Sequence, residues 1–369
     1  MNLELTDEQL ALQETVRRFL AEKASVAAHV RQLLDDPTGT TDAVWRGLAA
    51  LGATGVLVPE EHHGAGMTMV EAGTVAEELG AALHPGPWLS SAVAAPRALT
   101  RIGAGDNAAA LLAAIADGSS VATVGPLTGA RPEAVQLGEG SGDGIVLRGK
   151  VAALPDAAAA DVVLVLAEEP AGTGLFAVDT ASAGLVVTPR PHVDPTRKLF
   201  DVEFDGVTAQ RLGSASAEAV QGLVDDVLIA HAADALGAAR AVMNLAVEYA
   251  KVRRQFDQPI GSFQAVQHLC VDMYETVELA RSGVTHAIWA ADSAEPAERH
   301  VAALHAKAFA GRLASVGDNA IQVLGGIGYT WEHDAHLYLK RLLGWSAFLG
   351  GPDQYLEEVG RRLVLSASG

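Results

Sequence analysis

The first 115 residues place apolar positions at helical spacing, separated by short breaks that contain Gly and Pro. The segment "ELTDEQLALQETVRRFLAE" sets Thr6 and Gln9 at the spacing of a capping box, and apolar residues follow mostly at the i, i+3 and i+4 positions of a helix. Similar helical patterns continue to about Ile115. The pattern therefore predicts a helical N-terminal domain over residues 1–118.

Near Ser120 the pattern changes to short, Val-rich runs separated by Gly, Asp and Pro, which is typical of strands and turns. The runs are "SVATVGPL", "AVQLGEG", "GIVLRGKVAAL", "ADVVLVLAE", "GLFAVDT", "GLVVTPR" and "KLFDVEFDGV". They predict a small β-barrel or β-sandwich domain over residues 119–214. The stretch from Gly138 to Gly144 fails the test for a dinucleotide-binding loop, and we expect a hairpin loop there.

From Ser216 the helical period returns and persists. The stretch that ends in "EYAKVRRQF" contains no Pro, so it predicts one long helix or two in tandem. Two later stretches, "FQAVQHLCVDMYETVELARSGVTHAIWAADS" and "RHVAALHAKAFAGRLASVGDNAIQVLGG", predict one further helix each. Residues 215–369 are therefore expected to form a C-terminal four-helix bundle domain, and the whole chain a mostly helical fold with a central β domain.

Composition narrows the class of protein. Hydrophobic residues make up 49% of the 369 residues, which supplies apolar surface for a well-buried core. The formal net charge of −19 and the pI of about 4.9 argue against nucleic acid as a partner, because binding phosphates requires clustered Lys and Arg. Cys270, the single cysteine, excludes an internal disulfide and fits a cytoplasmic protein. No stretch predicts a membrane span, and "MNLELTDEQL" has no apolar region typical of a signal peptide.

A cationic turn stands out in this acidic chain. "VRRQFDQPIGSFQAVQ" places Arg253 and Arg254 where the long helix is expected to end. Such cations can complement the helix dipole, or they can bind a phosphate or pyrophosphate, because Arg offers bidentate donors. A second candidate is "NAIQVLGGIGYT", in which glycines follow a helix, the reverse of the order in a dinucleotide-binding loop. A helix C-cap explains one of these glycines well and all three less well.

The stretch "TWEHDAHLYLKR" brings together Glu332, His333, Asp334 and His336, which are residue types that bind metals. Glu332 and His336 would share a helical face, but no third ligand follows at a recognisable spacing. We expect the acidic start of a helix here and no metal site.

Five stretches together resemble the acyl-CoA dehydrogenase family of flavoenzymes. They are "ELTDEQLALQETVRRFLAE", "LGATGVLVPEEHHGAG", "VDPTRKLFDVEFDGV", "RRQFDQPIGSFQAVQ" and "QVLGGIGYTWEHDAHLYLKR". The resemblance extends over nearly the whole chain, and the last two stretches are specific to the family in this order. It implies the same helical, β, helical architecture, FAD as cofactor, an acyl-CoA substrate and electron-transfer flavoprotein as electron acceptor.

The resemblance also implies roles for the two candidate stretches. In the family, they bind the adenosine diphosphate part of FAD that is held in a neighbouring subunit. The matching positions here are Arg253, Gln255, Phe256, Gln322, Gly325 and Gly326. A pyrophosphate needs fixed cationic donors and glycines that allow the backbone to approach, so the residue types agree with this role.

The family's reaction is α,β-desaturation, in which a carboxylate removes the α proton of the thioester. In one branch this Glu corresponds to Gly350 here, and in the other to about Val227 on the long helix. Asp225 and Asp226 lie close to the second position, but one residue along a helix rotates by about 100°, so they are weak candidates. The segments that contact the flavin ring in the family also differ, and read "VGPLTGARPE" and "VAALPDA".

The chain thus keeps the part of the FAD site that is given to a neighbour and departs from the part that would hold its own flavin and base. It resembles the non-catalytic partner subunit of actinobacterial heterotetrameric (α2β2) acyl-CoA dehydrogenases, which act on steroid side-chain CoA thioesters. Two alternatives remain: a self-sufficient homo-oligomer that uses Asp225, Asp226 or another carboxylate, and a flavin-free scaffold or acyl-CoA-binding relative.

Overall fold

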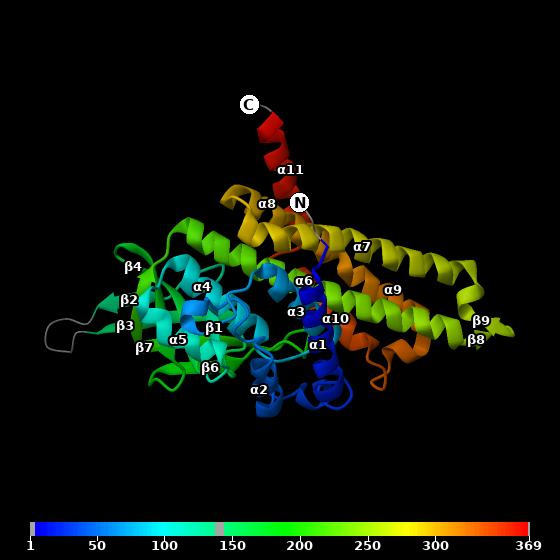
Figure 1. Ribbon diagram of the computed structural model, residues 1–369, viewed down its shortest axis with the longest axis horizontal. Coiled ribbons are helices and arrows are strands. Elements are labelled where there is room, and N and C mark those ends of the chain that lie inside the picture. Colours follow the sequence, from blue (N-terminus) through cyan, green and yellow to red (C-terminus); the bar gives the residue numbers. More distant parts are fainter. Residues whose placement is uncertain (1–3, 137–143, 368–369) are drawn as a thin grey trace.

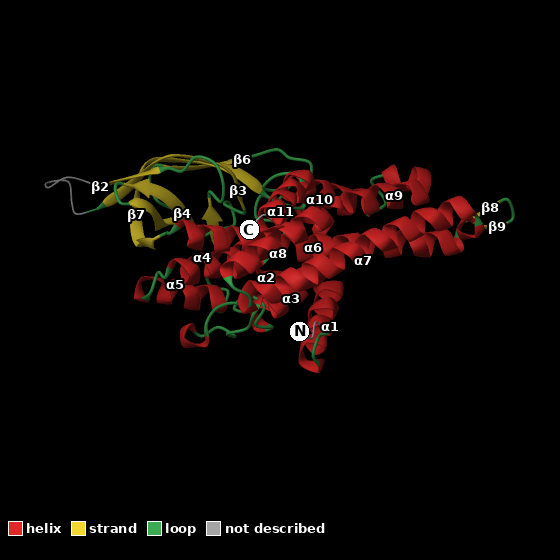
Figure 2. Ribbon diagram, turned by 90° about the horizontal axis from the view of Figure 1, so that it is seen from above, coloured by secondary structure: helices red, strands yellow, loops and turns green. Residues whose placement is uncertain are grey.

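The computed structural model describes residues 4–136 and 144–367. An N-terminal group of helices, a small β-barrel and a set of long C-terminal helices follow one another along the chain (Figure 1). The barrel lies at one end of an elongated molecule, and the ends of the two longest helices lie at the other (Figure 2). This arrangement confirms the predicted mostly helical fold with a central β domain.

The N-terminal helices begin at a capping box. The Thr6 hydroxyl accepts a hydrogen bond from the backbone N–H of Gln9, and the Gln9 side chain accepts one from the backbone of Thr6, as the spacing predicts. The helices are α1 (Asp7–Lys23), α2 (Asp42–Ala50), α3 (Met69–Ala81), α4 (Ala95–Ile102) and α5 (Asp106–Ala116), and a π-helical segment, η3 (Leu89–Ala94), leads directly into α4.

Seven strands form the β domain, and each overlaps one of the predicted runs. They are β1 (Ala122–Gly125), β2 (Glu133–Gln136), β3 (Ile145–Pro155), β4 (Val162–Glu169), β5 (Gly172–Asp179), β6 (Leu185–Pro189) and β7 (Leu199–Ser214). The pairings β4–β2, β2–β3, β3–β7, β7–β5 and β5–β4 close the sheet on itself, while β1 and β6 add to β4 and β7. Apolar side chains such as Phe176, Phe200 and Phe204 fill the interior.

The hairpin loop is expected at Gly138–Gly144, and its residues 138–143 lie outside the described part of the chain. The strands on either side of it, β2 and β3, pair antiparallel, with Gln136 opposite Ile145.

Long helices make up the rest of the chain. They are α6 (Ala217–Val252), α7 (Gln264–Ser293), α8 (Pro296–Ala310), α9 (Ala314–Leu324), α10 (Ala335–Ala347) and α11 (Pro352–Ala367). The 36 residues of α6 form one continuous helix, about 54 Å long. A small hairpin of β8 (Arg254–Gln255) and β9 (Gln258–Pro259) joins α6 to α7. Within the described part of the chain, no helix is both long and apolar enough to cross a membrane.

One predicted helix is wrong. The stretch from Arg299 to Gly326 does not form a single helix, because a 3₁₀ turn at Gly311–Leu313 separates α8 from α9. Pro352, at the start of α11, packs against this turn so closely that a Cβ atom at Gly311 would lie 2.7 Å from the Pro352 Cβ. The break between α8 and α9 is therefore accompanied by a contact with Pro352, which is distant in sequence. The local periodicity of apolar residues does not indicate this contact.

Close packing of α3 against α6 fixes the position of the long helix. A Cβ atom at Gly237 would lie 1.8 Å from the carbonyl oxygen of Glu77, and one at Gly80 would lie 1.8 Å from that of Asp234. Two glycines therefore let the helix backbones touch. This contact holds one face of α6 against the N-terminal helices.

Candidate functional site

A cavity of about 370 Å³ lies between the barrel and the C-terminal helices. Two of its walls are Val124–Thr128 and Val151–Pro155, the two segments that the family resemblance places at the flavin ring. The fold therefore brings these segments together, although they differ from the family in sequence. The other lining residues are His192, Val193, Leu199, Gly344, Ala347, Phe348 and Leu349. Most of this lining is apolar.

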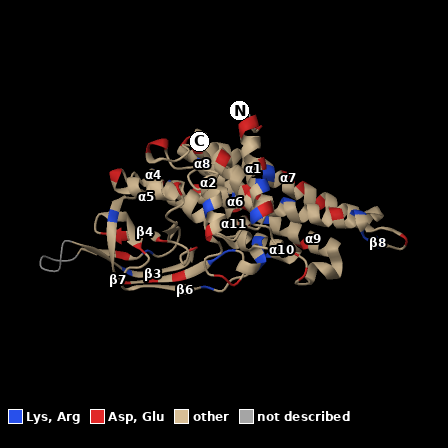
Figure 3. Ribbon diagram, turned by 60° about the horizontal axis from the view of Figure 1, so that its bottom comes forward, with Lys and Arg blue, Asp and Glu red and all other residues tan. Residues whose placement is uncertain are grey.

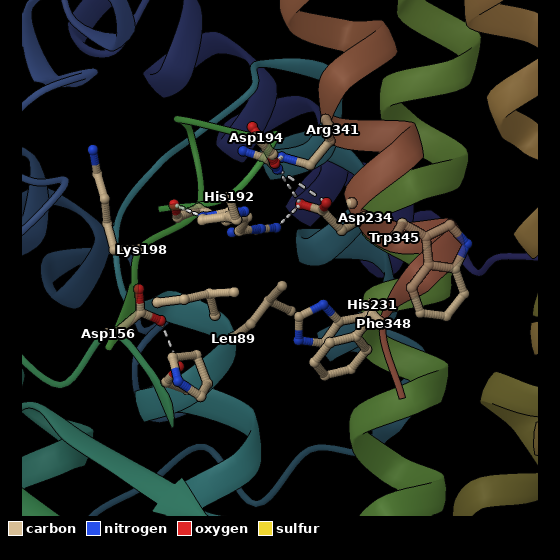
Figure 4. Close-up of a pocket in the computed structure, with 15 residues that line it drawn as sticks. Leu89, Asp156, His192, Asp194, Lys198, His231, Asp234, Arg341, Trp345 and Phe348 are labelled. Carbon is tan, nitrogen blue, oxygen red and sulfur yellow. Dashed lines mark hydrogen bonds and ion pairs between the residues drawn. The ribbon is translucent and has the colours of Figure 1, made fainter. Parts of the chain in front are cut away.

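Figure 4 shows the residues that line a smaller cavity, of about 70 Å³. The two share five lining residues, which are Pro155, His192, Leu199, Gly344 and Phe348. Helix α6 contributes His231 and Asp234 to the smaller cavity, and α10 contributes Arg341 and Trp345. We refer to the two together as the interdomain cavity.

Arg341 is the centre of an ion-pair network at one side of the interdomain cavity. Its side chain is 2% exposed and contacts Asp194 at 2.9 Å and Asp234 at 3.0 Å. Arg197 binds the other oxygen of Asp234 at 2.6 Å. Burial acts to lower the pKa of Arg341, but pairing with these carboxylates outweighs it and holds the pKa above its usual value. The network ties the loop before β7 to α6 and α10.

Lys198 and Asp156 complete the charged groups of the cavity. The Lys198 ammonium donates to the carbonyl oxygens of Leu33, Leu34 and Pro195. The Asp156 carboxylate accepts a 2.5 Å hydrogen bond from the Ser90 hydroxyl, and burial raises its pKa. Three cations and three carboxylates thus line the interdomain cavity, and each already has a partner within the chain.

His231 differs from these groups. Its imidazole stacks on the Phe348 ring at a centroid distance of 4.3 Å, and Figure 4 shows its nitrogens turned toward Leu89 across the cavity. Among the described residues it has no hydrogen-bond partner. Burial lowers its pKa to about 3, so the ring is neutral at neutral pH and presents one donor and one acceptor.

One wall of the interdomain cavity, Val151–Pro155, does not suit the polar edge of a flavin ring. The pyrimidine edge of the ring carries nitrogens and carbonyl oxygens that need hydrogen-bond donors. The side chains of Val151–Pro155 offer none, and Pro155 has no backbone N–H. The backbone N–H of Ala153 is already bonded to the Asp201 carboxylate at 3.0 Å. The space is adequate, but this wall offers no side-chain donor.

The turn at the far end of α6 does fit a pyrophosphate. Arg253 ends the helix and is exposed, and its guanidinium has no hydrogen-bond or ion-pair partner among the described residues. Basic positions lie beside β8 at this end of the molecule (Figure 3). Phe256 is 86% exposed and adopts a positive φ of 50°. Gln255 is also exposed, and its amide nitrogen donates to the Arg254 carbonyl.

Side-chain capping of α6 does not explain the three cations at its end. Lys251 pairs with the Glu248 side chain at 2.6 Å, and the Arg254 guanidinium donates to the carbonyl oxygen of Asp257. Neither contacts the last carbonyls of the helix. A general interaction with the helix dipole remains compatible with all three.

The glycine segment after α9 is open as well. Gln322 is exposed on α9, Gly325 follows with a φ of +64°, and no atom lies within 4 Å of a Cβ atom built at Gly325 or Gly326. Figures 1 and 2 show that this end of α9 lies toward the same end of the bundle as β8 and β9. Backbone groups here are free to approach a ligand that the chain itself does not supply.

The weak candidates for a base do not face the interdomain cavity. Asp225 is 1% exposed and contacts His300 at 2.8 Å and Gln221 at 3.0 Å. Asp226 is fully buried and pairs with Arg101. Burial acts to lower the pKa of the Arg101 guanidinium, but this pair keeps it raised. Asp225 pairs on the side of α6 that faces α8 through one of its oxygens, and Asp226 pairs on the side that faces α4.

The two usual base positions are also unsuited to a carboxylate. Val227 is 4% exposed and packs in an apolar cluster. Gly350 has a φ of +112°, and a Cβ atom there would lie 2.6 Å from the side-chain oxygen of Gln354. A larger residue at Gly350 would be strained in this backbone.

The acidic turn before α10 begins a helix, as predicted. Asp334 precedes α10 and binds Arg31 at 2.7 Å, and His333 accepts a hydrogen bond from the backbone of Ala335. Within residues 4–136 and 144–367, no group of three or more His, Cys, Asp and Glu side chains is placed to hold a metal ion.

Sequence reasoning identified the two barrel walls of the interdomain cavity but missed His231 and the charged residues of the smaller cavity. His231 carries the one available signal, because it follows Val227 by four residues and so lies on the same face of α6, one turn further on. The partners of Arg341 lie 147 and 107 residues away in sequence, so no local pattern connects them.

Comparisons with known proteins agree with this architecture. Residues 6–119 match the family described as acyl-CoA dehydrogenase, N-terminal domain, and residues 220–364 match acyl-CoA dehydrogenase, C-terminal domain. Acyl-CoA dehydrogenase FadE34 of Mycobacterium tuberculosis is 37% identical over 96% of this chain, which spans about half (48%) of that protein.

Two solved structures are similar over nearly their whole length. A variant of the steroid ACAD Tcur3481-Tcur3483 has a TM-score of 0.87 and 29% identity, and the match covers 98% of this chain and 99% of the other. The ChsE4-ChsE5 complex from Mycobacterium tuberculosis has a TM-score of 0.88 and 27% identity, with 99% of each chain covered. The chain therefore belongs to the acyl-CoA dehydrogenase family, whose cofactor is FAD.

Proposed function

We propose that this chain is the non-catalytic partner subunit of a heteromeric acyl-CoA dehydrogenase and completes the FAD site of a sibling subunit that carries the base. The reaction is α,β-desaturation of an acyl-CoA thioester, in which a carboxylate takes the α proton and FAD, when bound, accepts the β hydride. Electron-transfer flavoprotein is the expected acceptor. A steroid side-chain or another bulky acyl group is the expected substrate.

One observation carries the proposal, namely the contrast between the middle of α6 and its C-terminal end. Beside the middle of the helix, the Val151–Pro155 wall of the interdomain cavity offers no side-chain donor for a flavin ring. At the C-terminal end the side chain of Arg253 is exposed and unpaired among the described residues. The 22 residues from His231 to Arg253 span about 33 Å along the helix axis, so this arginine cannot reach the chain's own cavity. The arrangement suits a group held by a neighbour.

Each exposed residue has a defined task in such a complex. The Arg253 guanidinium would bind pyrophosphate oxygens of the neighbour's FAD through charge-assisted hydrogen bonds. Gly325 and Gly326, which lack side chains, would let the backbone approach the same group. The similarity to the ChsE4-ChsE5 complex and to the steroid ACAD Tcur3481-Tcur3483 supports a heteromeric assembly and a bulky substrate.

The test is to express the chain alone and together with a dehydrogenase-like chain encoded beside it. Bound-flavin absorbance per chain and acyl-CoA-dependent reduction of an electron acceptor are then measured. Flavin and activity only in the complex, with half as many flavins as chains, support the partner role. One FAD per subunit and activity in the chain alone refute it. A colourless, inactive complex would instead favour the flavin-free scaffold.

The self-sufficient alternative has its own test. In a preparation of the chain that is active alone, Asp225→Asn and Asp226→Asn are compared with the wild type. Activity that survives both substitutions removes these two carboxylates as bases. The ion pair of Asp226 with Arg101 makes loss of folding the expected result of Asp226→Asn, so thermal unfolding is followed in parallel.

A further inference from the structure

We propose that the interdomain cavity is a binding site for an uncharged, largely apolar small molecule that carries one carbonyl or hydroxyl oxygen, which His231 binds. The site occupies the place of a flavin ring but has different chemistry. The inference does not depend on the partner role, because it concerns only this chain's own cavity.

Size and lining favour an apolar ligand. The larger part of the cavity, about 370 Å³, lies within the range of roughly 300–1,000 Å³ that is usual for small-molecule sites. Its walls are formed by aliphatic and aromatic side chains from the barrel and from α10 and the residues that follow it. These are Val124, Leu127, Val151, Leu154, Val193, Leu199, Phe348 and Leu349. Burial of an apolar molecule against them is favourable, since both surfaces leave water.

Charge argues for a neutral ligand. The three cations of the interdomain cavity are occupied, because Arg341 and Arg197 bind carboxylates and Lys198 binds three backbone carbonyls. A phosphate or carboxylate entering the cavity would find no free cation and would lose its hydration without compensation. The chain's own ion pairs therefore exclude a charged group and leave the apolar walls available.

His231 supplies a polar contact. Its imidazole is held by stacking on Phe348, so its orientation is fixed before a ligand arrives. The other histidine of the cavity, His192, already contacts the Arg197 carbonyl at 2.7 Å. A neutral imidazole can donate to a ketone or accept from a hydroxyl, and either partner would satisfy the nitrogen that faces the cavity.

Calorimetric titration of the purified full-length chain, without FAD, tests the proposal. The probes are 2-undecanone, its charged counterpart undecanoate, progesterone as a fused-ring ketone, and lumiflavin. We expect at least one of the two ketones to bind at least tenfold more tightly than undecanoate and lumiflavin. Equal or tighter binding of undecanoate or lumiflavin would overturn the proposal, as would no binding of either ketone to the folded chain.

Two substitutions locate the site. His231→Phe keeps the aromatic stack but removes the polar nitrogens, and it should weaken ketone binding about 2- to 12-fold. Ala152→Trp places a bulky ring in the wall of the larger cavity and should weaken ketone binding more than His231→Phe does. His286→Phe on α7 lines neither cavity and is the matched control. Unchanged ketone binding in both test variants, with normal thermal unfolding, would refute the placement.

Discussion

Replacement of Arg253 by Gln tests whether the end of α6 completes a cofactor site. A hydrogen bond to a charged group contributes about 1.5–3 kcal/mol, and each 1.4 kcal/mol changes a dissociation constant tenfold. Arg253 is exposed in the chain alone, so solvent screening reduces this contribution toward its lower limit. We therefore expect Arg253→Gln to raise the dissociation constant of FAD from the assembled complex about tenfold, and the loss to shrink at high salt.

The assay is fluorescence titration of FAD into flavin-depleted complex at low and high ionic strength. Lys251→Gln is the matched control, because Lys251 lies one half-turn earlier, carries the same charge and is paired with Glu248 at 2.6 Å. We expect less than a twofold change for this variant, since its pair is exposed. If Arg253→Gln binds FAD as tightly as the wild type, or if the two variants lose the same amount, Arg253 does not contact the cofactor.

Three further results are expected. Arg341→Met removes the α10 cation that pairs with the buried carboxylate of Asp234. The substitution should lower the free energy of unfolding by about 3–5 kcal/mol, measured by urea denaturation. Burial lowers the pKa of His84 from 6.5 to about 3, so the unfolded chain binds a proton in this window and the folded chain does not. Stability should therefore fall with decreasing pH from about 6.5 to about 3, by about 1.4 kcal/mol per pH unit from this residue, and His84→Leu should reduce the slope. Gly350→Glu restores a carboxylate at a usual base position, but with a φ of +112° it should cost about 1–3 kcal/mol and give the chain alone no desaturase activity in an acceptor-reduction assay.

The fold was predictable where local pattern decides the structure. The capping box at Thr6 and the Val-rich runs of the barrel depend on neighbouring residues, and both are present. The break at Gly311 was not predictable, because the contact that accompanies it comes from Pro352. The sequence did not decide whether the strands form a closed barrel or a sandwich, because a strand pattern does not state which strands pair.

The candidate site divides in the same way. Arg253 and Gly325 lie in contiguous motifs, so their roles could be proposed from sequence, and the structure adds that they are exposed. The ion pair between Asp194 and Arg341 joins residues 147 positions apart and carries no motif. Helical periodicity places His231 on the same face of α6 as Val227. Only the structure shows that His231 lines a cavity.

Because α6 is one continuous helix, inserted residues within it would move its C-terminal end relative to the interdomain cavity. A single inserted residue between His231 and Arg253 would rotate the end of the helix by about 100° and advance it by about 1.5 Å, so the arginine would point away from its partner. An insertion of seven residues would nearly restore the direction, with a drift of about 20°, but would displace the end by about 10 Å. Helix α6 therefore sets the distance between the interdomain cavity and Arg253. Under the proposed partner role, the number of residues along it becomes a criterion for choosing candidate sibling chains.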